Sequence, residues 1–192
     1  VVVVWGVGLR RPALEAAAAE HLTEVAAIRD EPRPADFDNT IAALERSGRN
    51  LDRITSVFYN LTGAHTNAAL QAVEREVAPM LARHWNAIHL DPALFRRVDA
   101  VKAREAELGL DAEQSRVLDN CHRDFRRMGA GLPEAERRRL AEIGERLAAL
   151  GTQFGQNVLA DEQSFVLPLE TEADLAGLPD DGRTAARQAA EE

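Results

Sequence analysis

Apolar residues recur at helical spacing along most of this chain, and the clearest example lies in its first third. Phe37, Ile41 and Leu44 fall at i, i+4 and i+7, which places them on one face of a helix. Gly48 follows the last of these positions, where a helix ends most easily in the left-handed conformation. A second apolar stripe then starts at Leu51. The pattern predicts a helical hairpin whose two helices share one apolar seam.

The same periodicity, bounded by capping residues and prolines, predicts helices over most of the remaining chain. Asp36 or Asp38 is placed to cap the first helix of the hairpin, and Asp111 with Gln114 three residues later forms a capping-box pattern. Further helices are predicted from Pro12 to about Asp30, from a cap at Thr66 or Asn67 to Ile88, from Pro92 to Leu108, from Asp111 to Met128, from Pro133 to Val158 and from Gly182 to Glu192.

The ends of the chain and one internal segment depart from this regular pattern. Residues 1–10, which open with VVVVWGVGL, are assigned as a divergent leader, with a short strand as the alternative. Residues 165–169, FVLPL, have extended character, and Pro168 limits them to an edge strand at most. The last helical pattern reaches Glu192 without a capping residue, so we expect the chain to stop within a helix of a longer protein. The sequence therefore predicts an all-α fold, a multi-helix bundle of antiparallel helical hairpins over residues 11–192.

Composition narrows the possible partners without identifying one. The chain has 192 residues, of which 45% are hydrophobic and only 5% aromatic, so its core must consist mainly of Leu, Ala, Val and Ile side chains. A net charge of −9 argues against nucleic acid or an anionic membrane surface as the main partner. No apolar run approaches the roughly 20 residues that span a bilayer. We therefore expect neither a nucleic-acid nor a membrane partner.

Cys121 is the single cysteine of the chain, so no internal disulfide can form. A reducing cytoplasm is the expected location. Cys121 shares an apolar stripe with Leu118 and Phe125, which favours a buried thiol that acts as a small hydrophobic group. The adjacent His122 points about 100° away around the helix, so the two side chains do not form a catalytic pair.

Motifs distributed over about four-fifths of the chain resemble those of one enzyme family. The longest is FDNTIAALERSGRNLDRI, residues 37–54. It is followed by EVAP and LARH within residues 76–84, LFRRV at 94–98, FRRMGA at 125–130, LGTQFGQNVL at 150–159 and DLAGLP at 174–179. This ordered series resembles the N-terminal region of the thimet-oligopeptidase-like zinc metallopeptidases, above all their bacterial oligopeptidase A and peptidyl-dipeptidase Dcp branch. Residues 1–9 depart from the family, because its usual entry motif is missing there.

The resemblance implies a function for a longer protein. In this family, helices of the N-terminal region form one wall of a deep channel that admits short peptides. A separate lobe hydrolyses those peptides with a zinc-bound water. The implied partners are therefore the C-terminal catalytic lobe of the same protein and short peptide substrates. The motifs are compatible both with an endopeptidase and with a peptidyl-dipeptidase.

The zinc-binding motif of the family, H-E-x-x-H, is absent from this sequence. None of the five histidines is followed by glutamate. The histidines are His21, His65, His84, His89 and His122. We therefore predict no catalytic, cofactor-binding or metal-binding residue in this chain and no peptidase activity of the chain alone, with zinc held by the catalytic lobe.

Other arrangements of these side chains give no convincing alternative site. His21 and Glu24 lie one helical turn apart and could bind a metal with a third ligand from elsewhere. A surface hydrogen bond or ion pair is the favoured interpretation, because metal sites need several convergent ligands. His84 and His89 are five residues apart and point to different faces of a helix. A G-x-S-x-G nucleophile elbow is absent as well.

The few aromatic side chains leave a choice between two interpretations. Tyr59, Trp85 and Phe95 could line a substrate channel or the seam to another lobe, although core packing is the favoured interpretation. Apolar surface that normally packs on a missing lobe would favour self-association. The alternative to a peptidase domain is a free-standing helical module that binds an amphipathic segment of a partner and has no catalytic activity.

Overall fold

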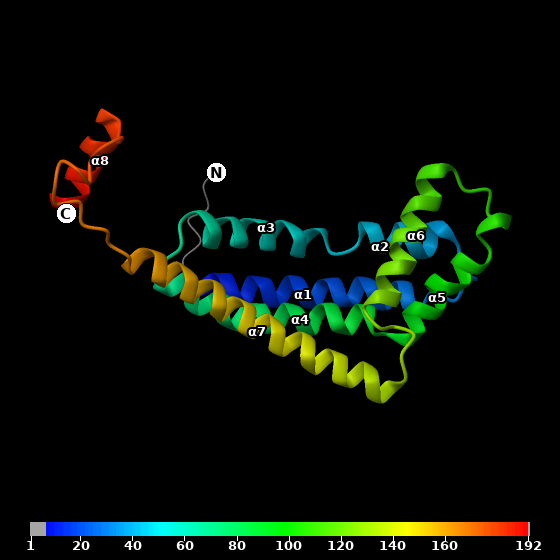
Figure 1. Ribbon diagram of the computed structural model, residues 1–192. Helices are drawn as coiled ribbons and strands as arrows, with labels where there is room; N and C mark the ends of the chain where they lie inside the picture. The colour runs from blue at the N-terminus through cyan, green and yellow to red at the C-terminus, as the bar shows by residue number, and fades with distance from the viewer. Residues whose placement is uncertain (1–6, 192) are drawn as a thin grey trace. The chain divides into compact units, whose positions relative to one another are not determined.

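The fold is all-α over residues 7–191, the part of the chain that a computed structural model describes (Figure 1). No strand occurs in this range, so the predicted fold class is confirmed. The elements are α1 (Val7–Arg29), the π-helical turn η1 (Phe37–Ile41), α2 (Ala42–Arg46), α3 (Arg49–Ala64), α4 (Ala68–His89), α5 (Pro92–Ala103), the 3-10 turn η2 (Glu105–Glu107), α6 (Ala112–Arg127), α7 (Glu134–Ser164) and α8 (Asp180–Glu191).

The observed elements differ from the predicted ones mainly at their ends. Residues 7–10 of the assigned leader belong to the start of α1, and residues 1–6 lie outside the described part of the chain. The helix predicted from Pro92 ends at Ala103 and continues only as the short turn η2. The first helix of the predicted hairpin begins with a π-helical turn, which the apolar spacing did not indicate.

The chain forms two compact units, Val1–Gln156 and Asn157–Glu192, and α7 passes from the first into the second. In the second unit, residues 165–169 are exposed and belong to neither a helix nor a strand. The carboxylate of Asp174 accepts hydrogen bonds from the backbone N–H groups of Glu170 and Thr171. Arg183 on α8 donates to the carbonyl oxygen of Leu175 at 2.9 Å, which ties the turn before α8 to that helix.

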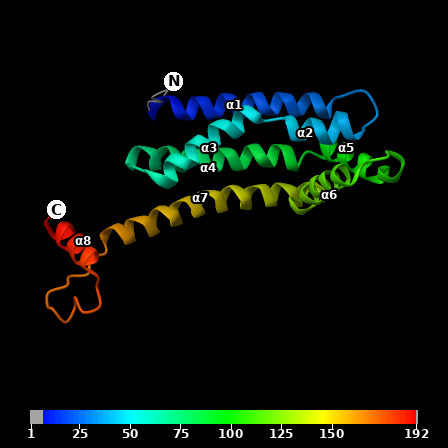
Figure 2. The ribbon, with the colours of Figure 1, turned by 90° about the horizontal axis from the view of Figure 1, so that it is seen from above.

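In the first unit α1 packs along both α3 and α4, as Figures 1 and 2 show. At the other end of the unit, α5 packs on α6, and both contact η1. The interior is divided into two apolar clusters. The α3 cluster consists of Leu14, Ala17, Ala18, Leu51, Phe58, Leu70, Val77 and Leu81. The α5–α6 cluster consists of Val25, Ile28, Ile41, Ile88, Leu94, Val98, Val101, Leu118, Phe125 and Ala130.

Two buried histidines lie between these clusters. On α1, His21 follows the residues that belong to the α3 cluster and precedes those of the α5–α6 cluster. His84 occupies the corresponding position on α4, between Leu81 and Ile88. The exposed fractions of the two histidines are 6% and 4%. A polar pair therefore separates two apolar regions along the same two helices.

Local hydrogen bonds explain where several elements begin. Asp36 and Asn39 form a reciprocal capping box, with the Asn39 N–H donating to the Asp36 carboxylate at 2.7 Å. Asp111 and Gln114 form the second box, as predicted. Gly48 has a φ of +72° and ends the first of the two predicted helices, again as predicted. These signals involve only neighbouring residues, so the sequence alone is enough to locate them. The shared apolar seam predicted for these two helices is wrong, because Ile41 packs in the α5–α6 cluster whereas Leu51 and Phe58 pack in the α3 cluster.

Candidate functional site

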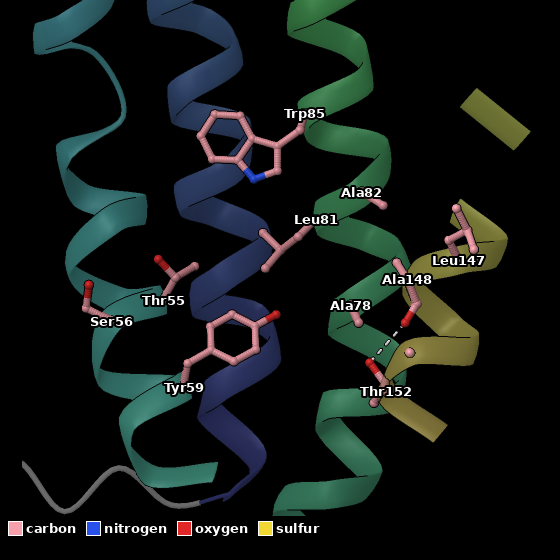
Figure 3. Close-up of a pocket in the computed structure, with 11 residues that line it drawn as sticks. Thr55, Ser56, Tyr59, Ala78, Leu81, Ala82, Trp85, Leu147, Ala148 and Thr152 are labelled. Carbon is pink, nitrogen blue, oxygen red and sulfur yellow. Dashed lines mark hydrogen bonds between the residues drawn. The ribbon is translucent and has the colours of Figure 1, made fainter. Parts of the chain in front are cut away.

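An open groove of about 710 Å³ lies between α3, α4 and α7 within the first unit (Figure 3). Each helix contributes one wall. The groove is lined by Thr55, Ser56 and Tyr59 of α3, by Ala78, Leu81, Ala82 and Trp85 of α4, and by Leu147, Ala148, Gly151 and Thr152 of α7. No charged side chain is among these lining residues, so the groove is suited to neutral ligand groups.

The α4 wall follows directly from helical geometry. Ala78, Leu81, Ala82 and Trp85 occur at i, i+3, i+4 and i+7, so they lie along one face of the helix. The two alanines leave space beside the larger Leu81 and Trp85 side chains. Trp85 remains 42% exposed, which leaves part of its ring available for contact.

The α3 wall combines hydroxyl groups with an aromatic ring. The Thr55 hydroxyl donates within its own helix, with the carbonyl oxygen of Leu51 at 2.9 Å. Tyr59 is 41% exposed and its phenol points into the groove in Figure 3. Burial, with a smaller effect from the Glu74 carboxylate, raises the pKa of Tyr59. The phenol therefore stays protonated near neutral pH and acts as a hydrogen-bond donor.

The α7 wall is held on α4 by polar contacts. The Asn86 amide donates to the carbonyl oxygen of Ala141 at 3.3 Å, and the Gln156 amide donates to the carbonyl oxygen of Gln71 at 3.1 Å. Arg83 and Glu145 form an ion pair at 3.3 Å. These contacts connect polar positions of α7, rather than its apolar stripe, to the rest of the unit.

The apolar stripe of α7 is largely exposed. It consists of Ile143, Leu147, Leu150 and Phe154, spaced at i, i+4, i+7 and i+11. Leu147 is 62% exposed and Phe154 is 70% exposed. At about 100° per residue, the stripe lies roughly on the opposite side of the helix from Ala141, Glu145 and Gln156. Leu147 at the edge of the stripe reaches the groove, and Ile143, Leu150 and Phe154 keep between 39% and 70% of their surface exposed.

The predicted aromatic residues have different environments. Phe95 packs against the α5–α6 cluster and stacks on Phe125, with ring centroids 6.2 Å apart. Core packing, the favoured interpretation for all three residues, therefore describes Phe95. It is wrong for Trp85 and Tyr59, because both line the groove and remain substantially exposed.

His21 and Glu24, the pair considered as a partial metal site, have different hydrogen-bond partners in the structure. His21 contacts His84, with Nδ1 of the first ring 3.0 Å from Nε2 of the second. Glu24 accepts a hydrogen bond from the Gly48 backbone N–H at 2.7 Å. The favoured surface interpretation of His21 is therefore also wrong, because the ring is buried and bonded to another helix. Within residues 7–191, no three His, Cys, Asp or Glu side chains converge as metal ligands.

The remaining candidate groups have ordinary structural partners. His89 Nδ1 lies 3.0 Å from the carbonyl oxygen of Trp85, one turn earlier on α4. His122 and Asp99 form a pair at 3.0 Å between Nε2 and Oδ1. Cys121 is half-buried, and burial raises the pKa of its thiol to about 12. The thiol is therefore protonated near neutral pH.

Sequence reasoning missed the contact between His21 and His84, whose positions are 63 residues apart. A signal was present, because His21 lies at helical spacing from Leu14 and Val25, and His84 lies between Leu81 and Ile88. A histidine on each of two apolar faces indicates burial. The sequence contains no information that pairs these two faces with each other.

Comparisons with known proteins identify relatives over nearly the whole chain. Dipeptidyl carboxypeptidase of Escherichia coli (strain K12) is 41% identical over 182 residues, or 95% of this chain. Oligopeptidase A of Salmonella typhimurium (strain LT2) is 27% identical over 180 residues, and that of Haemophilus influenzae is 28% identical over 181 residues. No family model matches the chain.

This chain is homologous to the N-terminal region of dipeptidyl carboxypeptidase and oligopeptidase A. The resemblance to these peptidases inferred from the motifs is confirmed. The matched region is 27% of the Escherichia coli dipeptidyl carboxypeptidase and 26% of the Salmonella oligopeptidase A, so the chain spans about a quarter of the length of these relatives. Between residues 7 and 191 of this peptidase-related chain, no helix has both the length and the hydropathy to cross a bilayer.

Proposed function

We propose that this chain forms one wall of the peptide channel of a longer zinc-dependent oligopeptidase or peptidyl-dipeptidase. The supporting observation is its 41% identity to dipeptidyl carboxypeptidase over 95% of the chain but only 27% of that relative. In this proposal the C-terminal catalytic lobe of the same protein holds the zinc and cleaves short peptides. The chain itself supplies shape and peptide contacts. We place the protein in the cytoplasm, without nucleic-acid or membrane partners, in keeping with its single cysteine and its charge of −9.

The groove supplies the surface that such a wall needs. Tyr59 and Trp85 offer aromatic faces for apolar peptide side chains. The hydroxyls of Ser56, Tyr59 and Thr152 offer hydrogen bonds to a peptide backbone. The lining residues include no charged side chain, so a neutral peptide segment can bind without placing a charged side chain in an apolar contact. The groove therefore favours short, unstructured peptides with apolar side chains over highly charged ones.

Peptide binding by this chain can be measured directly. The probe is an N-acetylated, C-amidated octapeptide with a central Leu-Phe, titrated by calorimetry and by NMR of the ¹⁵N-labelled chain. We expect shifts at groove residues, and a loss of affinity of at least fivefold in Trp85→Ala and in Tyr59→Ala. Phe154→Ala is the matched control, because this exposed aromatic residue does not line the groove. Equal losses in Phe154→Ala and Trp85→Ala, or shifts confined to residues outside the groove, would contradict the assignment.

A second experiment tests whether this chain alone hydrolyses peptides or binds zinc. The chain is incubated with a quenched fluorescent peptide and zinc, with and without a chelator, and zinc binding is measured by calorimetry. We expect no turnover and no stoichiometric zinc binding, because the H-E-x-x-H motif is absent from the sequence. Peptide hydrolysis that requires zinc and stops with the chelator would overturn this part of the proposal.

The exposed stripe of α7 is the surface that we assign to a protein partner. Four apolar side chains in a row favour contact with another apolar surface. In the longer peptidase this surface packs on the remainder of the protein, and in the isolated chain it promotes self-association. Leu147→Glu with Phe154→Glu should abolish concentration-dependent association in sedimentation experiments, whereas Val57→Glu on exposed α3 surface should not. A wild-type chain that is monomeric at every concentration would argue against the assignment.

The same stripe is the observation that favours the alternative, a helical interaction module without catalytic activity. The two proposals differ in whether the full-length protein also contains a catalytic lobe with an H-E-x-x-H motif. If the coding sequence continues beyond Glu192 to an H-E-x-x-H motif, the peptidase proposal is supported. If no such motif follows and the chain fails to bind the octapeptide, the interaction module is the better account.

A further inference from the structure

The contact between His21 and His84 is an unusual feature of the first unit. It joins α1 to α4 at a point where both helices pass from one apolar cluster to the other. Both rings are more than nine-tenths buried. His21 also reaches Ser47 in the turn between α2 and α3, with Nε2 3.1 Å from the hydroxyl oxygen. The pair therefore connects three parts of the fold through one short chain of polar groups.

The direction of the hydrogen bonds can be deduced from the Ser47 hydroxyl, the last polar group in this series. The Ser47 hydroxyl donates its proton to the carbonyl oxygen of Leu44 at 2.7 Å, so it accepts from Nε2 of His21. A neutral His21 then carries no proton on Nδ1, which accepts from Nε2 of His84. The remaining ring nitrogen, Nδ1 of His84, is buried and has no hydrogen-bond partner. The neutral pair thus satisfies three of its four ring nitrogens.

An added proton disrupts this arrangement at either ring. On Nδ1 of His21 it removes the acceptor that faces His84. His84 then either keeps its proton on Nε2, so that two N–H groups face each other, or moves it to Nδ1, where the N–H is buried without a partner. A proton added to Nδ1 of His84 creates a buried cation whose new N–H has no partner. Neither ring has a carboxylate as a hydrogen-bond partner that could compensate for the charge.

The charged groups around the pair come from several helices. Glu24 of α1 raises the pKa of His21, whereas burial, the larger effect, lowers it. His89 of α4 lowers the pKa of both histidines. Glu45 of α2 and Asp124 of α6 line, with His21 and His89, a small pocket of about 170 Å³. The Ser47–Gly48 turn before α3, which contacts the His21 ring, carries no charged side chain. For His84, burial is the largest influence and lowers the pKa to about 4.

Trp85 connects the histidine pair to the groove. Its indole packs edge-on against both imidazoles, with centroids 5.6 Å from His21 and 5.1 Å from His84. The same indole lines the groove between α3, α4 and α7 (Figure 3). A change in the charge or position of either imidazole therefore acts on a side chain of the groove wall.

We propose that His21 and His84 form a pH-sensitive latch, which holds α1, α4 and the Ser47–Gly48 turn together when neutral and releases them, moving Trp85 in the groove wall, when protonated. The latch is a property of this chain itself and does not depend on peptide binding or on a catalytic lobe. Its operating range is acidic, from below the pKa of a free histidine down to about 4, the pKa of His84.

Tryptophan fluorescence provides the test, because the chain has two tryptophans and Trp5→Phe leaves Trp85 as the only one. In this background we expect a reversible change in emission as the pH falls from about 7 to about 3.5, past the pKa of about 4 of His84, with helical circular dichroism retained. His84→Gln keeps a neutral hydrogen-bond donor near Nε2 and should abolish most of the change, as should His21→Gln. The matched control, His65→Gln, alters an exposed histidine and should leave it intact.

A second measurement avoids the risk that a histidine variant fails to fold. NMR titration of the imidazole Cε1–H signals of the wild-type chain reports each histidine separately. We expect His84 to titrate at least one pH unit below the value of a free histidine. A wild-type His84 that titrates like a free histidine would overturn the proposal, and so would a fluorescence change that persists unaltered in both His84→Gln and His21→Gln.

Discussion

Gly48 and His21 are in direct contact where the turn between α2 and α3 meets α1. A Cβ atom built on Gly48 would lie 2.7 Å from two atoms of the His21 ring. Gly48 also has a φ of +72°, and its N–H donates to the Glu24 carboxylate at 2.7 Å. The backbone conformation, the space and the hydrogen bond all suit glycine at this position.

Gly48→Ala is therefore expected to destabilise the chain by about 2–3 kcal/mol, from the left-handed backbone and the clash with His21 together. Gly63→Ala is the matched control, because Gly63 lies in α3 with open space around its Cβ position and no positive φ. That control should be neutral or stabilising by up to about 1 kcal/mol. Urea unfolding followed by circular dichroism measures both. Equal midpoints for the two variants would contradict the expectation.

Arg97 holds the proline-rich turn before η1. Its guanidinium donates to the carbonyl oxygen of Glu31 at 2.7 Å and to the side-chain oxygen of Asn39 at 3.0 Å. Arg97→Ala removes the donor to the partly buried carbonyl oxygen of Glu31 and one of the donors to Asn39, so we expect a loss of about 2 kcal/mol of unfolding free energy. Arg96→Ala, on the exposed side of α5, should change stability by less than about 0.5 kcal/mol. A comparable loss in both variants would show that the hydrogen bonds of Arg97 are not responsible.

Stability should depend on pH through His84. Its folded-state pKa of about 4 lies below the unfolded value, so the unfolded chain binds the proton more readily. The stabilisation is present above the unfolded pKa of about 6.5 and is lost as the pH falls toward 4. Between about pH 7 and pH 5 the loss amounts to about 2 kcal/mol. Carboxylates also titrate in acid, so the decisive quantity is the difference in pH dependence between the wild-type chain and His84→Gln in urea unfolding.

The Cys121 thiol should be unreactive in the folded chain. Burial raises its pKa to about 12, so the thiolate is scarce at about pH 8. Alkylation by iodoacetamide is expected to be about 100-fold to 1,000-fold slower in the folded chain than in concentrated urea, by the change in thiolate fraction. Mass spectrometry measures both rates. Similar rates would mean that the thiol is accessible and ionised in the native fold.

Asp111 should contribute to stability through its capping box. Asp111→Ala removes the acceptor for the Gln114 N–H, so we expect a loss of about 1 kcal/mol. Glu113→Ala, an exposed change in the same first turn of α6, removes only a weak interaction with the helix dipole and should cost a few tenths of a kcal/mol. Unfolding midpoints distinguish the two. A larger effect at Glu113 would contradict the capping role.

Much of the fold could be predicted from the sequence because its signals are local. The caps at Asp36 and Asp111 and the left-handed Gly48 depend on residues within a few positions of each other. The apolar spacing also located α7, although it ended the helix at Val158 and α7 continues to Ser164. It did not predict that Leu147 and Phe154 would be exposed, because periodicity shows which face of a helix is apolar but not what that face contacts.

The groove and the histidine pair required the structure for a different reason. Trp85 and Tyr59 lie on separate helices, and their exposure depends on the small Ala78 and Ala82 side chains beside them. Because aromatic residues at helical spacing are usually buried, the general expectation was core packing. Only the arrangement of three helices reveals these two rings as parts of one surface.

The position of the two histidines also has a mechanical consequence. Among the described core residues, α1 and α4 supply members of both the α3 cluster and the α5–α6 cluster. Backbone amides of α3 and of α6 should therefore exchange with deuterium as two separate sets, each opening at its own rate. A local unfolding event that starts in α5 and α6 is therefore transmitted to the α3 cluster through α1 and α4, along the segments that carry His21 and His84.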